Sequence, residues 1–126
     1  MLYSRAHPTH KPSDRLAMQS ISIKDEYAEI FSTLGDLQAT IDAALQRYAI
    51  EKITQKINEL RQQDDGYAAK YGMGYADFST KASTDIEFVN HVEHSIEKTW
   101  EIDLANWEFC HRGIDDWMQK LKLLSK

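Results

Sequence analysis

The sequence is short of residues that break or cross-link a chain: its 126 residues include one cysteine, two prolines and five glycines. A single cysteine excludes an intramolecular disulfide and is typical of a reducing compartment, so we expect a cytoplasmic protein. Few prolines and glycines mean few turns, which favours a mostly helical fold. No apolar run approaches the ~18 residues that a membrane-spanning helix needs, so we expect no membrane partner.

The sequence also lacks the residue patterns of common catalytic and cofactor sites. It has no P-loop and no glycine-rich dinucleotide motif. His91 and His94, with Cys110 and His111 further along, do not have the spacing of a zinc finger. Glu108 and His111 form one Glu-x-x-His pair, whereas a di-iron bundle needs two such pairs. We therefore predict no metal site and no cofactor, and a protein that is not an enzyme.

Charge is unevenly distributed along the chain. Up to and including Lys24 there are four basic residues and one acidic residue, a balance of +3. Because the whole chain carries −5, the remainder carries −8. We predict that residues 1–17 form a flexible basic arm that contacts phosphates, the alternative being an arm that only improves solubility. Among the acidic residues, the pair Asp64 and Asp65 is interpreted as solvated surface.

The order of patterns in residues 20–62 indicates one short strand followed by two helices. Residues 20–24 alternate polar and apolar side chains, which is the pattern of a half-buried strand. Residues 25–34 carry apolar side chains at helical spacing, and Gly35 is placed to end that helix. Asp36 can cap a second helix that continues to about residue 62. A strand this short needs a partner, so we expect the same strand of a second copy to pair with it.

This order resembles the ribbon-helix-helix repressors of the MetJ and Arc type, in which a two-stranded ribbon from two chains reads DNA. Residues 41–48, Ile-Asp-Ala-Ala-Leu-Gln-Arg-Tyr, are similar to the run near the end of that family's second helix. The resemblance implies a homodimeric DNA-binding module at residues 18–60. It implies DNA contacts from Arg15, Ser20, Ser22 and Lys24, and a dimer core of Ile21, Ile23, Ile30, Leu45 and Tyr48.

Residues 61–126 are acidic and contain all three tryptophans. We expect helix breaks at residues 62–66, which end in Gly66, and at residues 72–74, which contain two glycines. Thr84 followed by Glu87 has the form of a capping box and predicts the start of another helix there. The region is therefore expected to form a helical hairpin or bundle.

A near-heptad apolar seam runs through the last part of the chain and is interrupted by one acidic residue. It is interpreted either as core that packs on the second helix or, in part, as a partner-binding face; Gly113 within it predicts a kink or break. The seam consists of Ile96, Trp100, Asp103, Trp107, Cys110, Ile114, Trp117, Leu121 and Leu124. The residues expected to bind a partner are Trp100, Asp103, Trp107, Glu108, Asp115 and Trp117.

Two classes of function are open. The resemblance implies a DNA-binding antitoxin of a toxin–antitoxin pair. Its ribbon would repress its own operator, and its acidic helices would neutralise a basic protein toxin of the ribonuclease type. The alternative is a helical adaptor or inhibitor that acts by protein–protein interaction without DNA. In both cases the predicted fold is mostly α, with a long second helix followed by a C-terminal helical region.

Overall fold

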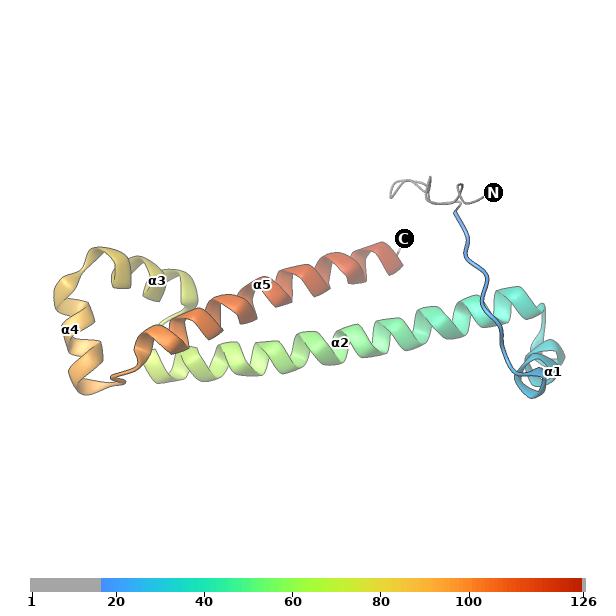
Figure 1. The fold of residues 1–126 in the computed structure, drawn as a ribbon, viewed down its shortest axis with the longest axis horizontal. Coiled ribbons are helices and arrows are strands. Elements are labelled where there is room, and N and C mark those ends of the chain that lie inside the picture. Colours follow the sequence, from blue (N-terminus) through green and yellow to red (C-terminus); the bar gives the residue numbers. More distant parts are fainter. Residues whose placement is uncertain (1–16, 126) are drawn as a thin grey trace, which may run out of the picture. The chain divides into compact units, whose positions relative to one another are not determined.

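A computed structural model describes residues 17–125 of the chain, and within this range it is helical with no strand. The predicted mostly helical fold is therefore confirmed. The chain divides into two compact units, Met1–Thr40 and Ile41–Lys126, which are described separately below. The helices of the described range are α1 (Asp25–Leu34), α2 (Leu37–Tyr71), α3 (Tyr75–Thr84), α4 (Ile86–Ser95) and α5 (Trp100–Leu124) (Figure 1).

The predicted ribbon-helix-helix fold is wrong, because residues 17–24 form no strand. Ile21, expected inside the ribbon core, is 71% exposed. Alternating polar and apolar residues are compatible with a half-buried strand. A stable strand also needs backbone hydrogen bonds to a neighbouring strand. Instead, the carbonyl of Lys24 accepts the first hydrogen bond of α1, from the amide of Tyr27 at 3.0 Å. The predicted arm of residues 1–17 lies almost entirely outside the described residues.

The described part of the first unit is α1 with its flanking turn. Tyr27, Ile30 and Leu34 follow one another at helical spacing, but α1 has no buried residue. Gly35, with φ +147°, ends the helix as predicted. Asp36 then caps the next helix as predicted, since its carboxylate accepts a 2.9 Å hydrogen bond from the amide of Ala39.

The second helix is longer than predicted. It spans 35 residues and passes through residues 62–66 without a break, so the break predicted there is wrong. One glycine costs a helix only about 1 kcal/mol relative to alanine, which the surrounding helical residues offset. The helix ends at the second predicted break, where Gly72 adopts a φ of +76° that suits glycine. The Gly72 amide donates to the Ala68 carbonyl at 2.8 Å.

Helices α3 and α4 pack at the end of α2 where α5 begins (Figure 1). Thr84, the predicted cap, is instead the last residue of α3, so that prediction is wrong by one residue. Asp85 caps α4 instead, accepting a 3.1 Å hydrogen bond from the amide of Phe88. A carboxylate is at least as good a cap as a hydroxyl, and the Thr84 hydroxyl is already used by the Thr80 carbonyl.

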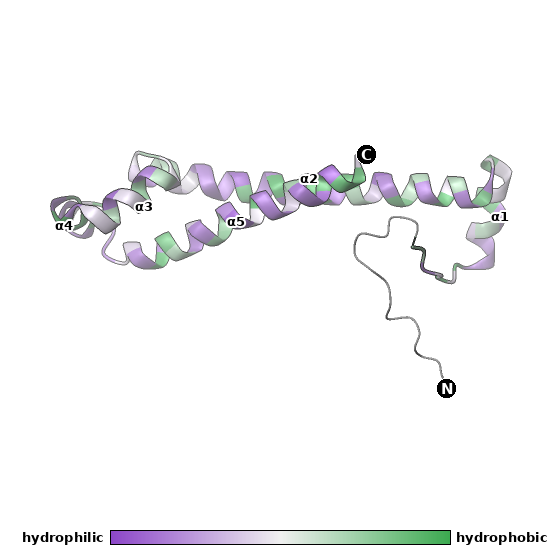
Figure 2. Cartoon of the chain, turned by 90° about the horizontal axis from the view of Figure 1, so that it is seen from above, coloured by the Kyte–Doolittle hydropathy of each residue, from purple (hydrophilic) through white to green (hydrophobic). Residues whose placement is uncertain are grey.

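Helix α5 returns along α2, and it is one helix from Trp100 to Leu124, so the break predicted as one possibility at Gly113 is absent. Gly113 has a different role: a Cβ at this position would lie 2.9 Å from the Cδ1 atom of Leu60. Beside it, the Cys110 thiol lies 2.8 Å from the Leu60 carbonyl. The glycine therefore lets α5 approach α2 closely. Hydrophilic and hydrophobic residues are interspersed along both helices (Figure 2). None of the described helices is long and apolar enough to cross a membrane.

Candidate interaction surfaces

The described residues among those predicted to bind DNA do not lie on a common strand or helix that would direct their side chains toward DNA. Ser20, Ser22 and Lys24 lie in the irregular segment before α1. The Lys24 ammonium lies 6.0 Å from the ring centre of Tyr27. Arg15 lies outside the described residues. Without a strand, the alternate side chains of this segment are not held in register toward a DNA groove.

The residues predicted to form a dimer core are all accessible in the single chain. Ile21, Ile23 and Ile30 belong to the first unit, whereas Leu45 and Tyr48 belong to the second. Leu45 is 53% and Tyr48 62% exposed. The Lys52 ammonium lies 5.4 Å from the Tyr48 ring centre. Both side chains remain available to a partner.

The core of the second unit is an aromatic cluster around Trp107, which is 0% exposed. Its ring centre lies 5.5 Å from those of Tyr67 and Phe78 and 5.7 Å from that of Tyr75. Trp100, which is 8% exposed, packs against Phe78 and donates its indole N–H to Glu93 at 3.0 Å. Two of the tryptophans predicted to bind a partner are therefore packed inside the chain.

Asp64 joins this cluster from α2. Its Oδ1 atom accepts a 2.7 Å hydrogen bond from the Trp107 indole and lies 3.0 Å from Nε2 of His111. The His111 ring stacks on Tyr75 with centres 4.8 Å apart. The interpretation of Asp64 as solvated surface missed these bonds. The signal was its place in a helical stripe, four residues after Leu60 and three before Tyr67.

Asp103, the polar interruption of the predicted seam, is bonded within the chain. Its carboxylate accepts hydrogen bonds from Lys70 at 2.7 Å and from the Tyr71 hydroxyl at 2.6 Å. Lys70 also reaches Glu97 at 2.6 Å. The bonds to Asp103 and Glu97 raise the pKa of Lys70, and the bond from Lys70 lowers the pKa of Glu97. Burial, with the Asp103 bond, raises the pKa of Tyr71.

These polar groups form two small networks, one joining Lys70 and Tyr71 to Asp103 and Glu97, the other joining Asp64 to Trp107 and His111. Among the described residues, no group of three or more histidine, cysteine, aspartate or glutamate side chains could hold a metal ion. Cys110 is 0% exposed, and burial raises its pKa. A buried, protonated thiol is a poor nucleophile. The arrangement therefore stabilises the packing of α2 against α5.

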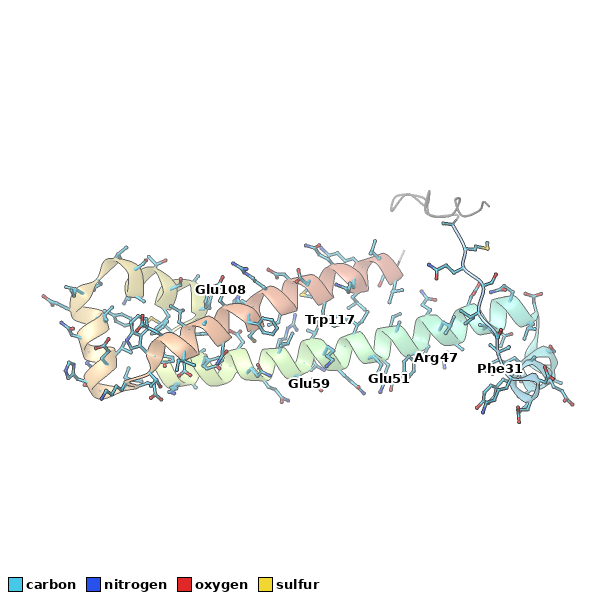
Figure 3. The ribbon with its side chains drawn as sticks, viewed as in Figure 1. Phe31, Arg47, Glu51, Glu59, Glu108 and Trp117 are labelled. Carbon is cyan, nitrogen blue, oxygen red and sulfur yellow. The ribbon has the colours of Figure 1, made fainter. Side chains whose placement is uncertain are left out.

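The remaining residues predicted to bind a partner lie along the outer and distal parts of α5. Glu108 forms an ion pair with Arg112 one helical turn away, and Asp115 is exposed. Trp117 is half-buried on the side of α5 that faces α2 (Figure 3), and the Lys120 ammonium lies 5.2 Å from its ring centre. Glu108 and Asp115 lie seven positions apart and share a face of α5, whereas Trp117 faces α2.

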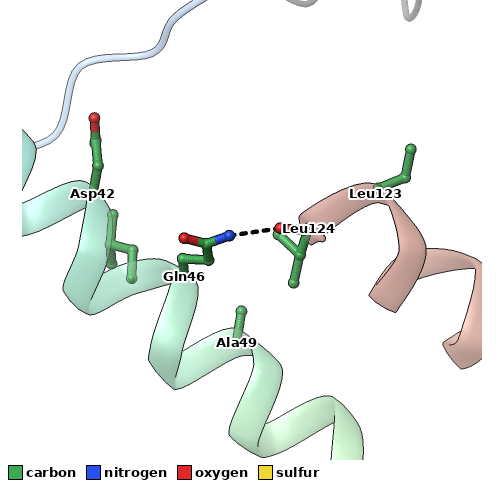
Figure 4. Close-up of a pocket in the computed structure, with 6 residues that line it drawn as sticks. Asp42, Gln46, Ala49, Leu123 and Leu124 are labelled. Atoms are coloured by element: carbon green, nitrogen blue, oxygen red, sulfur yellow. Dashed lines mark hydrogen bonds between the residues drawn. The ribbon is translucent and has the colours of Figure 1, made fainter. Parts of the chain in front are cut away.

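The distal part of the hairpin, here called the open half, comprises residues 41–60 of α2 and 112–125 of α5. At its end a shallow cavity of about 440 Å³, open to solvent, lies between the two helices. One hydrogen bond crosses it, 2.6 Å long, from the Gln46 amide to the Leu124 carbonyl (Figure 4). The cavity is lined mainly by apolar side chains from both helices: Leu45, Ala49, Leu123 and Leu124, with Asp42 and Gln46 at its edge.

The rest of the second unit, residues 61–111, is here called the acidic head. It contains ten acidic and four basic residues, a net charge of −6. Two large apolar side chains on its part of α5 point outward: Ile102 is 62% and Phe109 75% exposed. These residues were not predicted as binding residues, because the apolar seam on the other face of α5 dominated the pattern.

Comparison with known proteins identifies no relative: no protein-family model, no curated protein and no solved structure matches this chain.

Proposed function

We propose that the protein is a helical adaptor or inhibitor that acts by protein–protein interaction and works as a homodimer. Operator recognition was expected from an intermolecular ribbon beside a basic arm, and residues 17–24 form no strand. The helical adaptor or inhibitor, which was the alternative prediction, needs no ribbon. The surface that supports it lies in the open half of the hairpin.

The single observation that carries the proposal is the apolar cavity between α2 and α5. A long helical hairpin buries one side of each helix, and in the open half even this side is incompletely covered. Leu45 is 53% exposed and Leu123 67% exposed, although both line the cavity. Covering such side chains contributes roughly 1.5–3 kcal/mol each when burial is complete, so a partner that fills the cavity is favoured.

The charge of the open half is compatible with the binding of a second copy of the chain. The open half contains six basic and five acidic residues, a net charge of +1, although the rest of the chain is strongly acidic. Self-association at this end therefore meets little electrostatic repulsion. Glu51 and Glu59 lie on the side of α2 turned away from α5 (Figure 3), which leaves the apolar side free of their charge. Two hairpins packed here would form a four-helix bundle.

The test is the molar mass in solution, measured by light scattering on the full chain. The expected value is about twice the 14.6 kDa of one chain. Leu45→Asp should return it to the monomer value, because the cavity cannot bury a carboxylate without a partner. Since Leu45 is 53% exposed, helix content by circular dichroism should be unchanged.

Two matched variants complete this test. Ile86→Asp changes an equally apolar, 76% exposed residue in the acidic head, and Ile21→Asp changes the residue expected in the ribbon core. Both should remain dimeric. A wild-type chain that stays monomeric at millimolar concentration would contradict the proposal, as would a dimer that Ile21→Asp dissociates.

A further inference from the structure

We infer that the acidic head binds a basic amphipathic helix of another protein, with Ile102 and Phe109 as the apolar contacts. This inference rests on the proposed role as an interaction module, but it uses a different surface from the dimer. The observations that carry it are the exposure of these two side chains, their alignment on one helix and the charge around them.

The two apolar side chains form a short stripe on the outside of α5. Ile102 and Phe109 are seven positions apart in the helix, so they lie about two helical turns apart on the same face, about 10.5 Å along the axis. Phe109 is 75% exposed, whereas its neighbour Cys110 is 0% exposed. The core of the head is therefore complete without the stripe. An aligned pair of large exposed side chains is typical of a surface that a second helix covers.

The charge around the stripe selects the kind of helix. Glu101 and Glu108 directly precede the two apolar residues and lie along one edge of the stripe. Arg112 pairs with Glu108, but the head as a whole still carries −6. Lysine and arginine side chains beside an apolar face complement this surface, whereas an acidic helix, a nucleic acid or an anionic membrane would be repelled. A second copy of the head is disfavoured for the same reason.

The experiment titrates the full-length chain with a synthetic peptide, followed by calorimetry and by amide chemical shifts. The probe is an amidated helical peptide with leucine at heptad positions and lysine elsewhere, and its partner peptide replaces every lysine with glutamate. The lysine peptide should bind, shift the amides around Ile102 and Phe109, and bind more weakly as salt increases. The glutamate peptide should not bind. Binding of both peptides, or of neither, would overturn the inference.

Variants separate the stripe from general attraction to an acidic protein. The double variant Ile102→Ser/Phe109→Ser keeps every charge, and we expect it to bind the lysine peptide at least about tenfold more weakly. Ile86→Ser, at a residue of α4 that is 76% exposed, should bind as wild type. If the double variant binds as tightly as wild type, or if its molar mass changes, the inference fails.

The dimer is tested separately in the same assay. Leu45→Asp should bind the lysine peptide as wild type does, because Leu45 lies in the open half. If the wild-type chain proves monomeric while the peptide still binds at the stripe, the dimer proposal fails and this inference stands. If the dimer forms and the lysine peptide does not bind, the reverse holds.

Discussion

Asp64 of α2 accepts a 2.7 Å hydrogen bond from the indole of Trp107 on α5, and this indole is the centre of the aromatic core. Because Trp107 is 0% exposed, its buried N–H loses its charged acceptor if the carboxylate is removed. We expect Asp64→Ala to lower the free energy of unfolding by about 1–3 kcal/mol. Urea denaturation followed by tryptophan fluorescence measures this change.

The neighbouring residue provides the control for this prediction. Asp65 is exposed and has the same charge, so Asp65→Ala removes one acidic group without touching the core. It should change the free energy of unfolding by less than about 0.5 kcal/mol. Equal effects of the two substitutions would show that net charge, and not the Trp107 bond, accounts for the loss.

Gly113 and Gly66 allow a matched test of how closely α5 approaches α2. Both lie inside helices, but only at Gly113 would a Cβ meet a neighbour, Leu60 at 2.9 Å, while Gly66 faces open space within 4 Å. We expect Gly66→Leu to raise stability by about 1 kcal/mol through helix propensity. Gly113→Leu should lower it by about 1–3 kcal/mol through overpacking, measured by thermal or urea unfolding. A stabilising Gly113→Leu would contradict the close approach.

The ion pair of Lys70 with Glu97 predicts a dependence of stability on acid. The pKa of Glu97 is lowered in the folded chain, so the pair stabilises the fold above the ordinary glutamate pKa of 4.5. This contribution is lost as the pH falls through the lowered pKa. Glu97→Gln should therefore melt at a lower temperature than wild type at pH 7. The difference should vanish in strong acid, where wild-type Glu97 is also uncharged. A difference that persists there would refute this assignment.

The helices were predictable from sequence where local signals are strong. Gly35 and Asp36 fixed the turn between α1 and α2 because backbone conformation and capping are local properties. The strand predicted at residues 20–24 is absent, because alternating polar and apolar residues form a strand only when another strand is present to pair. The break predicted at Gly66 is wrong because the free-energy cost of one glycine in a helix is small compared with the tertiary packing of a long helix.

The candidate surfaces were harder to predict than the helices. The seam on α5 correctly marked apolar residues, but it could not separate Trp107, which is buried, from a residue that binds a partner. That distinction depends on Asp64 and Tyr75, which come from other helices. Likewise, Ile102 and Phe109 can be recognised as exposed apolar residues only when the buried side of α5 is known.

The most direct test of the proposed homodimer is a nuclear Overhauser measurement on a mixture of ¹³C-labelled and unlabelled chains. Isotope filtering then detects only contacts between two copies. The dimer through the open half predicts intermolecular contacts between the ring of Tyr48 and the methyl groups of Leu123 or Leu124. Contacts at Ile21 and Ile23 instead, or no intermolecular contacts in a sample that scatters light as a dimer, would contradict it.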